Sequence, residues 1–299
     1  MTPAVLGSRL RATAGVVVLM ACVHPKGDSD SAVRDSSTPD TDSALDTDTD
    51  SAAQIYRSCT DGGAAFLDDG TYFSTIQRSV DAVDALPSGG TVHVCPGTHE
   101  ENLDLEASIE PITIIGDANG TSVIDAGGYQ TEADMVSVVY TPGERDVALT
   151  LLTLTGGTGH PTCYEGDYDC QSYGGGIVAG GDLTLDRVTV TENTAFWDSA
   201  IAVSGGVTVS ITDSRVLGNT DRWCDDYPDR CGVVALGSGA TEEPWLTFTA
   251  TNTTWEGNSP HDIIIGAGST DHTTTTFMDV PPGTTTVSCT SETVSCTFE

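Results

Sequence analysis

The chain has 299 residues, of which 44 are acidic and 11 are basic, and its formal net charge is −33. A chain this acidic is excluded from the usual nucleic-acid binders, because contacts to phosphate need lysine and arginine. The length is sufficient for one large domain with its own hydrophobic core.

Residues 1–21 have the features of an export signal. They contain no acidic residue, and Arg9 and Arg11 precede an apolar run over residues 12–21. A run of about ten residues is too short to span a bilayer core of roughly 30 Å at about 1.5 Å per residue. A basic start, a short apolar core and a small final residue are typical of a signal peptide.

The end of this segment, Leu19-Met20-Ala21-Cys22, resembles the lipobox of bacterial lipoproteins. In that family the chain is cleaved before the cysteine, which is acylated, so the resemblance implies a membrane anchor at Cys22. Several acyl chains suffice for stable attachment. Val23 is not the aspartate that often marks inner-membrane retention, so the resemblance implies an outer-membrane lipoprotein facing the cell exterior. The alternative is an ordinary signal peptide followed by a chance cysteine.

Residues 22–56 are predicted to form a disordered acidic tether. Within residues 28–53 nearly every position is Asp, Ser, Thr or Ala, with eight aspartates against one arginine. Such a segment has too little apolar surface to offset its chain entropy. A calcium-binding acidic repeat is the alternative, although no glycine punctuates the acids as a calcium loop requires. Removal of residues 1–21 takes away two basic residues and no acid, which leaves a net charge of −35.

Residues 57–90 are predicted to form an N-terminal cap that contains one amphipathic helix over residues 74–86. Ser74 or Thr75 provides an N-cap, and the sequence Ser88-Gly89-Gly90 ends the helix. Four apolar residues recur at helical spacing: Ile76, Val80, Val83 and Leu86.

Residues 91–299 contain short strands of four to six residues, broken by Gly, Asn and Asp. Three blocks align, and they end in Asn193, Asn219 and Asn258, which are 26 and 39 residues apart. A repeat of this length is typical of a solenoid, in which each coil stacks on the next about 4.8 Å further along. We expect the asparagines to adopt the left-handed conformation at a turn and to bond in a ladder. An irregular β-sandwich is the alternative.

The chain from about residue 70 to residue 299 resembles the right-handed parallel β-helices of the pectin-lyase-like superfamily. The resemblance implies an all-β fold, a single-stranded right-handed parallel β-helix over residues 91–299 that follows an N-terminal capping helix. The matching stretches are residues 75–77, 89–94, 96–102, 112–117, 121–125 and 174–177.

The opening coils most resemble pectin methylesterases, which use two aspartates and an arginine. No glutamine here precedes Asp-Thr, and Pro244-Trp245 lacks the arginine of the third motif. Residues 262–266 echo the second motif but also fit a buried strand after Asn258. The Gly-His-Gly and Arg-Ile-Lys motifs of related glycosidases are missing, and lysine is absent after Lys26. No Ser-His-Asp, zinc or phosphate-loop motif occurs either, so we predict no catalytic residue.

Eight cysteines remain besides Cys22, and an even number in an exported chain indicates disulfides. Three pairs share a spacing of six intervening residues, and two cysteines are left over. Metal ligation is the alternative. The predicted pairs are Cys59–Cys95, Cys163–Cys170, Cys224–Cys231 and Cys289–Cys296.

The loops after the repeated asparagine are the candidate ligand site. Trp197 and Trp223 each follow a repeat asparagine by four residues. An aromatic face beside carboxylates suits a sugar ring, and calcium is a possible bridge although no cofactor is required. The alternative is that both tryptophans pack the loops. The inserts between the paired cysteines add the aromatics Tyr164, Tyr168 and Tyr227 and the calcium ligands Asp167, Asp169, Asp225 and Asp226.

These features predict a surface-anchored, non-catalytic protein that binds carbohydrate or a cell-surface partner. The alternative is a diverged carbohydrate-active enzyme: a polysaccharide lyase, a glycosidase or a pectinesterase-like protein. A pair of aspartates with raised pKa facing one groove favours the enzyme, whereas stacked aromatics without such a pair favour binding.

Overall fold

The computed structural model describes residues 55–56, 58–128, 135–162, 171–204, 206–222, 232–238, 246–266 and 275–299. All described residues belong to one compact unit, Thr47–Glu299. The predicted signal peptide, Cys22 and most of the tether lie outside the described residues. No helix among the described residues is long and apolar enough to cross a membrane.

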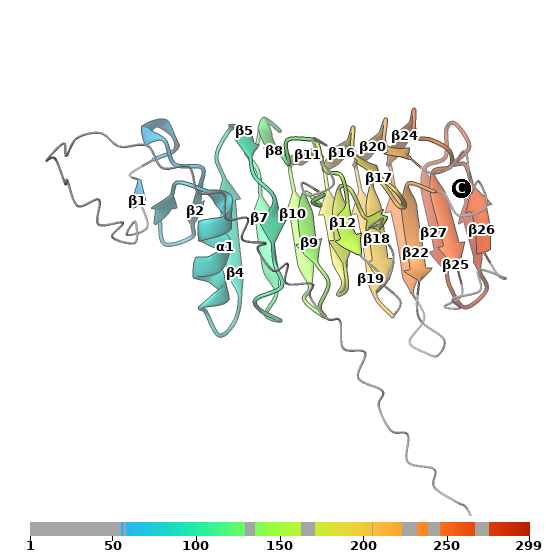
Figure 1. The fold of residues 1–299 in the computed structure, drawn as a ribbon, viewed down its shortest axis with the longest axis horizontal. Helices are drawn as coiled ribbons and strands as arrows, with labels where there is room; N and C mark the ends of the chain where they lie inside the picture. The colour runs from blue at the N-terminus through green and yellow to red at the C-terminus, as the bar shows by residue number, and fades with distance from the viewer. Residues whose placement is uncertain are drawn as a thin grey trace, which may run out of the picture. The chain divides into compact units, whose positions relative to one another are not determined.

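Three large β-sheets run side by side through this unit (Figure 1). The first contains, in spatial order, β1 (Ile55–Tyr56), β3 (Tyr72–Phe73), β2 (Ala65–Leu67), β4 (Gly90–Val94), β7 (Ile112–Ile115), β10 (Val147–Thr150), β15 (Leu183–Asp186), β19 (Thr208–Thr212), β23 (Thr247–Thr251), β27 (Thr286–Thr290) and β28 (Ser295–Phe298). The second contains β5 (Gly97–Glu100), β8 (Ser122–Asp125), β11 (Leu152–Thr155), β16 (Thr189–Thr191), β20 (Arg215–Leu217) and β24 (Thr254–Glu256). The third contains β6 (Leu103–Asp104), β9 (Val139–Thr141), β14 (Ile177–Ala179), β18 (Ile201–Ser204), β22 (Val234–Ser238), β25 (Ile263–Gly266) and β26 (Thr275–Met278).

Successive passes of the chain add one strand to each sheet in turn. From β4 to β23 in the first sheet every pairing is parallel, and the same holds from β5 to β24 in the second and from β6 to β25 in the third. The prediction of an all-β fold is therefore confirmed. The long parallel sheets argue against the alternative of a β-sandwich, whose sheets are antiparallel.

The core lies between the sheets and follows the two-residue alternation of the strands. One inward row of the first sheet runs in register through six neighbouring strands, and each of its side chains is at most 1% exposed. Burying each large aliphatic side chain contributes roughly 1.5–3 kcal/mol. The row consists of Val92, Ile114, Leu149, Leu185, Ile211 and Ala250.

The predicted asparagine ladder is present where the chain leaves the second sheet. The backbone amide and the side-chain amide of Asn193 both donate to Oδ1 of Asn219, each at 3.1 Å. Asn219 donates in the same two ways to Asn258, at 3.1 and 3.2 Å. The ladder thus links three successive coils through side chains as well as through strand pairing.

The expectation that the asparagines themselves take the left-handed conformation is wrong. The residue before each of them does so: Glu192 has φ 55°, Gly218 has φ 60° and Gly257 has φ 68°. The left-handed turn lies one residue before each asparagine because the amides of Asn193 and Asn219 must point at the asparagine of the next coil.

The N-terminal cap contains helix α1 (Ile76–Asp84), shorter at both ends than predicted. Thr75 is the N-cap, and its hydroxyl accepts a hydrogen bond from the Arg78 amide at 3.2 Å. The Glu101 carboxylate accepts the first free amides of the helix, a position in which negative charge is favourable. Leu86, expected on the apolar face, lies beyond the helix end and is 44% exposed.

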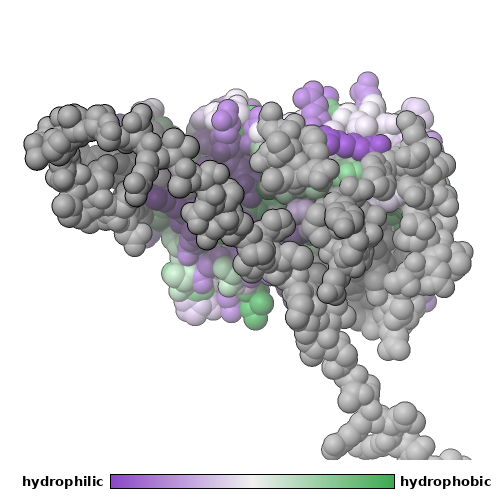
Figure 2. Space-filling view, in the orientation of Figure 1, coloured by the Kyte–Doolittle hydropathy of each residue, from purple (hydrophilic) through white to green (hydrophobic). Residues whose placement is uncertain are grey.

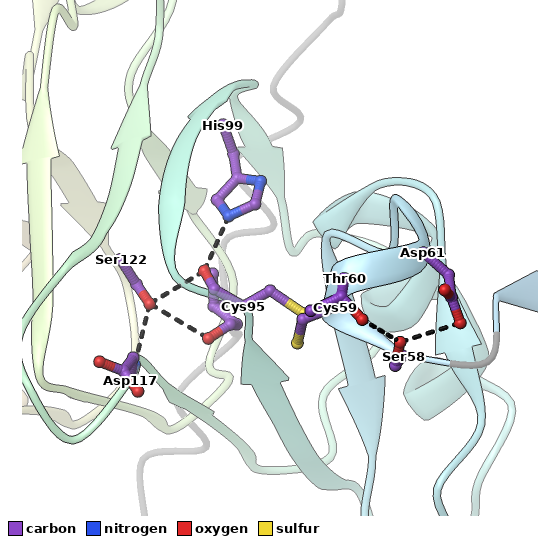
Figure 3. The surroundings of a disulfide bond; sticks show 9 residues. Ser58, Cys59, Thr60, Asp61, Cys95, His99, Asp117 and Ser122 are labelled. Carbon is purple, nitrogen blue, oxygen red and sulfur yellow. Dashed lines mark hydrogen bonds between the residues drawn. A yellow bond between two sulfur atoms is a disulfide. The ribbon is translucent and has the colours of Figure 1, made fainter.

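A disulfide joins the cap to the end of β4. Cys59, in the short 3-10 helix η1 (Cys59–Asp61), forms a disulfide with Cys95 (Figure 3). Their Cα atoms are 5.5 Å apart. The Cys95 carbonyl accepts one hydrogen bond from the Ser122 hydroxyl and one from Nε2 of His99. The bond therefore connects the cap to the first two coils.

A buried ion pair makes a second link between the cap and the sheets. The Arg145 guanidinium lies 2.6 Å from the Asp84 carboxylate at the end of α1, and their side chains are 1% and 10% exposed. Arg145 also donates to the Leu105 carbonyl at 3.3 Å. The guanidinium thus joins the cap helix to the chain that follows β6.

At the far end of the unit the strand direction reverses. β26 pairs antiparallel with β25, and β27 and β28 continue the first sheet in antiparallel fashion. Cys289 and Cys296 form a disulfide across β27 and β28, with a Cα–Cα distance of 4.1 Å. The other two predicted pairs, Cys163–Cys170 and Cys224–Cys231, lie outside the described residues.

Candidate functional site

Of the residues predicted to bind a ligand, the structure describes Trp197. Its side chain is 6% exposed, and its backbone is held by Ser172 and Gly174 of the neighbouring coil. A side chain so buried offers no face to a sugar ring, which favours the packing alternative at this position. Outside the described residues lie Trp223, Tyr164, Tyr168, Tyr227, Asp167, Asp169, Asp225 and Asp226.

The loop that carries Trp197 lies close to the preceding coil because glycines make room for it. A Cβ atom at Gly175 would lie 2.4 Å from the Ser199 carbonyl, and one at Gly176 would lie 2.5 Å from the Ala200 carbonyl. The glycine run is therefore needed to seat this loop.

Two aspartates next to this loop are buried side by side. Asp198 follows Trp197 and is 7% exposed, and Asp221 ends the short strand β21 (Thr220–Asp221) and is 5% exposed. β21 pairs in parallel with β17 (Thr194–Ala195), so the two carboxylates come from successive coils. Oδ1 of Asp221 accepts a hydrogen bond from the Ser199 amide at 2.8 Å.

Both carboxyl groups bind protons more tightly than usual. Burial raises the pKa of Asp198 well above its ordinary value, and the charge of Asp221 raises it further. Burial also raises the pKa of Asp221 to about 6, against the opposing effect of backbone amides led by that of Ser199. Water no longer solvates the charged forms, and the neighbouring like charge adds to the penalty.

The Asp221 carboxyl group is surrounded by hydrogen-bond donors: besides the Ser199 amide, the Ser199 hydroxyl and the backbone amides of Asp198 and Gly232 lower its pKa. Ser199 itself is fully buried. None of the four ion pairs among the described residues includes either aspartate. Within the described residues the pair is therefore held by hydrogen-bond donors rather than by an ion pair.

A second cluster lies on the outer side of the third sheet. Tyr140 of β9 stacks on His160 with ring centroids 3.7 Å apart and an angle of 13° between the planes. His160 begins β12 (His160–Thr162), which pairs antiparallel with β13 (Gln171–Tyr173). Both rings are half-buried, and Asp104 of β6 lies opposite Tyr140 in the sheet register.

Acidic neighbours shape the chemistry of this cluster. Burial raises the pKa of Tyr140 to about 12, with smaller contributions from the charges of Glu106 and Asp104. Burial lowers the pKa of His160, although the charge of Asp104 opposes that shift. At neutral pH the cluster is an uncharged aromatic pair beside two carboxylates, suited to stacking and to accepting hydrogen bonds.

Asp262 begins the stretch that resembles the second esterase motif, and its carboxylate is held by hydrogen bonds from neighbouring residues. Its Oδ1 accepts from the side chain of Asn258 and its Oδ2 accepts from the Val280 amide, both at 2.9 Å. Residues 263–265 are all buried and belong to strand β25. The interpretation of this stretch as a buried strand after Asn258 thus agrees with the geometry.

The surface formed by the described residues offers little apolar area for docking. Among the described residues Leu86 and Ile109 are the exposed large hydrophobics. Figure 2 shows that the coloured part of one face is mostly hydrophilic or neutral, with hydrophobic colour in small separate areas. No group of three or more His, Cys, Asp or Glu side chains among the described residues is arranged to hold a metal ion.

Sequence reasoning missed Asp198, Asp221, Tyr140 and His160. The sequence does point to the two aspartates, because both lie beside positions of the aligned repeat: Asp198 directly follows Trp197, and Asp221 is two residues after Asn219. No comparable signal joins Tyr140 to His160, which are brought together by the β12–β13 hairpin.

Comparison of the chain with protein-family models, with curated proteins and with solved structures gave no match.

Proposed function

We propose that this chain is an outer-membrane lipoprotein that binds carbohydrate at the cell surface without catalysis. The observation that carries the binding function is the stacked pair Tyr140–His160 beside Asp104 and Glu106. An aromatic ring packs against the C–H face of a sugar while carboxylates accept its hydroxyl hydrogens, and ligand sites commonly combine apolar surface with a few polar groups of this kind.

The scaffold we propose is a right-handed parallel β-helix of the pectin-lyase-like superfamily. Three parallel sheets that gain strands in chain order support it, as does the asparagine ladder at one corner. A right-handed crossover is also the rule for parallel strands joined within one sheet.

The anchor we propose is the acylated Cys22, with the acidic segment up to residue 56 as the tether. The lipobox and the short apolar run before it support this assignment. Intact-mass analysis of the mature protein is expected to show an acylated N-terminus at Cys22, and Cys22→Ala is expected to release the protein from membranes. An unacylated N-terminus elsewhere would refute the anchor.

A diverged carbohydrate-active enzyme is the second candidate, and the raised pKa values of Asp198 and Asp221 favour it. Their burial argues against it, since a catalytic acid must reach its substrate, and Asp221 is already bonded to the Ser199 amide. We therefore retain the binding function as the main proposal.

The experiment is a glycan-array screen of the full protein, followed by a product assay on every hit. His160→Ala is expected to weaken binding at least tenfold, and Tyr140→Phe is expected to retain the stack and most of the affinity. His261→Ala is a matched control, since His261 is a half-buried histidine paired with Asp279 at 3.0 Å. Binding unaffected by His160→Ala would refute the site, and product release lost in Asp198→Asn would favour the enzyme.

A further inference from the structure

We propose that the outward side of β19, β23 and β27 is an ice-binding surface, on which regularly spaced hydroxyl groups hold the first layer of water molecules of an ice lattice. These strands belong to the first sheet, whereas Tyr140 belongs to the third. The inference therefore does not depend on the proposed carbohydrate function.

The three strands share one pattern of side chains. They read Thr-Val-Ser-Ile-Thr in β19, Thr-Phe-Thr-Ala-Thr in β23 and Thr-Val-Ser-Cys-Thr in β27. The second and fourth residues of each strand are buried, so the first, third and fifth point outward. All nine outward residues are Ser or Thr, and none of them is buried. We call these nine residues the hydroxyl face.

Strand pairing arranges the hydroxyl face as a grid. Ser210 lies opposite Thr249, which lies opposite Ser288, and the residues on either side of this row are aligned in the same way. Neighbouring strands are about 4.8 Å apart, and every second residue along a strand is about 6.6 Å from the last. In β28, Ser295 and Thr297 extend the grid by one strand.

The uniformity of the hydroxyl face is not a property of these coils as a whole. Threonine is common in strands, so a few outward threonines alone would carry little information. On the second sheet, however, the coils of β19 and β23 present Arg215, Leu217 and Glu256 at outward positions. The hydroxyl face contains no charged and no aromatic residue, although the chain has 44 acidic residues.

The hydroxyl groups are available to an external partner. The Thr290 hydroxyl accepts a hydrogen bond from the Glu292 amide at 3.2 Å, and the other eight side chains make no hydrogen bond to a described residue. Threonine is β-branched, so its hydroxyl has few rotamers to lose. The Cys289–Cys296 disulfide ties β27 to β28. The grid is therefore ordered before it binds, which lowers the entropic cost of binding.

The chemistry of the grid selects the ligand. A hydroxyl both donates and accepts hydrogen bonds, so the complementary surface must be neutral, regular and able to do both. Ice meets these conditions, since every water molecule donates and accepts and its oxygen atoms repeat on a scale close to that of the grid. One such hydrogen bond contributes little, and the repetition of the contact provides the affinity. A polysaccharide surface is a poorer match, because sugar rings pack against aromatic side chains.

The test is incorporation of the full protein into slowly growing ice. The protein is purified in detergent and labelled with a dye at Lys26, the single lysine of the chain. A protein that binds ice enters the solid, whereas other solutes are excluded into the remaining liquid. The wild-type protein is expected to be enriched in the ice at least fivefold over Thr249→Tyr, because a ring at the centre of the grid prevents close contact.

Thr254→Tyr is the matched control. It makes the same substitution in the same coil, at an exposed position of β24 on the second sheet, and is expected to keep the full enrichment. Ser288→Tyr places the ring on β27 and is expected to lose enrichment as well. The urea midpoint of each variant identifies those that fold as the wild type does, and tyrosine is a residue that strands favour.

Two results would overturn the proposal. One is exclusion of the wild-type protein from the ice, and the other is equal enrichment of the wild type and the folded variants of the hydroxyl face. Microcrystalline cellulose provides the second arm of the experiment. Protein that is excluded from ice but is retained on cellulose through Thr249 would replace ice by a solid polysaccharide as the ligand.

Discussion

Removing the middle rung of the asparagine ladder provides the sharpest test of the fold. In Asn219→Ala, the Asn193 amide loses its acceptor and the Val190 carbonyl loses its donor, at distances of 3.1 and 3.0 Å in the native structure. Asn219 is fully buried, so water does not replace these bonds. Each buried polar group left without a partner costs about 1–3 kcal/mol, and the two together predict a loss of about 2–6 kcal/mol.

The outer rung should matter less. Asn258 is half-buried, so water can partly replace its bonds to Val216 and Asp262, and Asn258→Ala is expected to cost about 1–3 kcal/mol. Asn119→Ala is the control at an exposed turn, with an expected change within about 0.5 kcal/mol.

The assay is urea unfolding followed by circular dichroism, in which the midpoint shifts while the slope m stays constant. The expected order of destabilisation is Asn219, then Asn258, then Asn119. If Asn219→Ala unfolds within about 0.5 kcal/mol of Asn119→Ala, the ladder contributes nothing measurable and the reasoning from buried partners is wrong.

Three further predictions concern the cap and the aromatic cluster. Arg145→Met should cost about 3–5 kcal/mol in urea unfolding, because it leaves the buried Asp84 carboxylate without a partner, and Asp84→Asn added to it should restore part of the loss. Loss of the Cys59–Cys95 bond, whose partners are 36 residues apart, should cost about 4 kcal/mol of stability in the chain-entropy model. The measurement compares the Tm of the native protein with that of a variant in which both cysteines are replaced by Ser, and an unchanged Tm would refute the expected stabilisation. The ring of His160 should titrate below 6.5 by NMR because burial lowers its pKa. The unfolded chain then takes up this proton first, so the contribution of His160 to stability is constant above pH 6.5 and falls below it. A His160→Gln variant with the same pH profile would contradict this origin.

The sequence predicted the parts of the fold that repeat. Asn193, Asn219 and Asn258 follow a fixed pattern, so one alignment predicts their stacking, and the apolar spacing of Ile76, Val80 and Val83 predicts the cap helix. The left-handed residue was assigned one position too late, because a turn and a ladder both favour asparagine and the sequence does not separate the two roles.

The site residues were less predictable because they depend on contacts between coils. The burial of Asp221 follows from its register opposite Ala195, and register between coils is not visible in a single repeat. The stack of Tyr140 on His160 depends on how the β12–β13 hairpin folds back on the third sheet. Trp197 was noticed for its chemistry, but its 6% exposure reflects glycines at 175 and 176 that admit the loop.

The reversal of strand direction after β25 has a consequence for assembly. A stack of parallel strands presents nearly the same edge at both ends, so each end is a template on which an identical stack could continue growing into a fibre. The antiparallel strands β26, β27 and β28 occupy two of the three edges with a pattern that the opposite end does not match. The third edge is β24, which is only three residues long and includes Glu256. The architecture therefore limits its own length, because the two ends of the stack do not match one another for growth into a fibre.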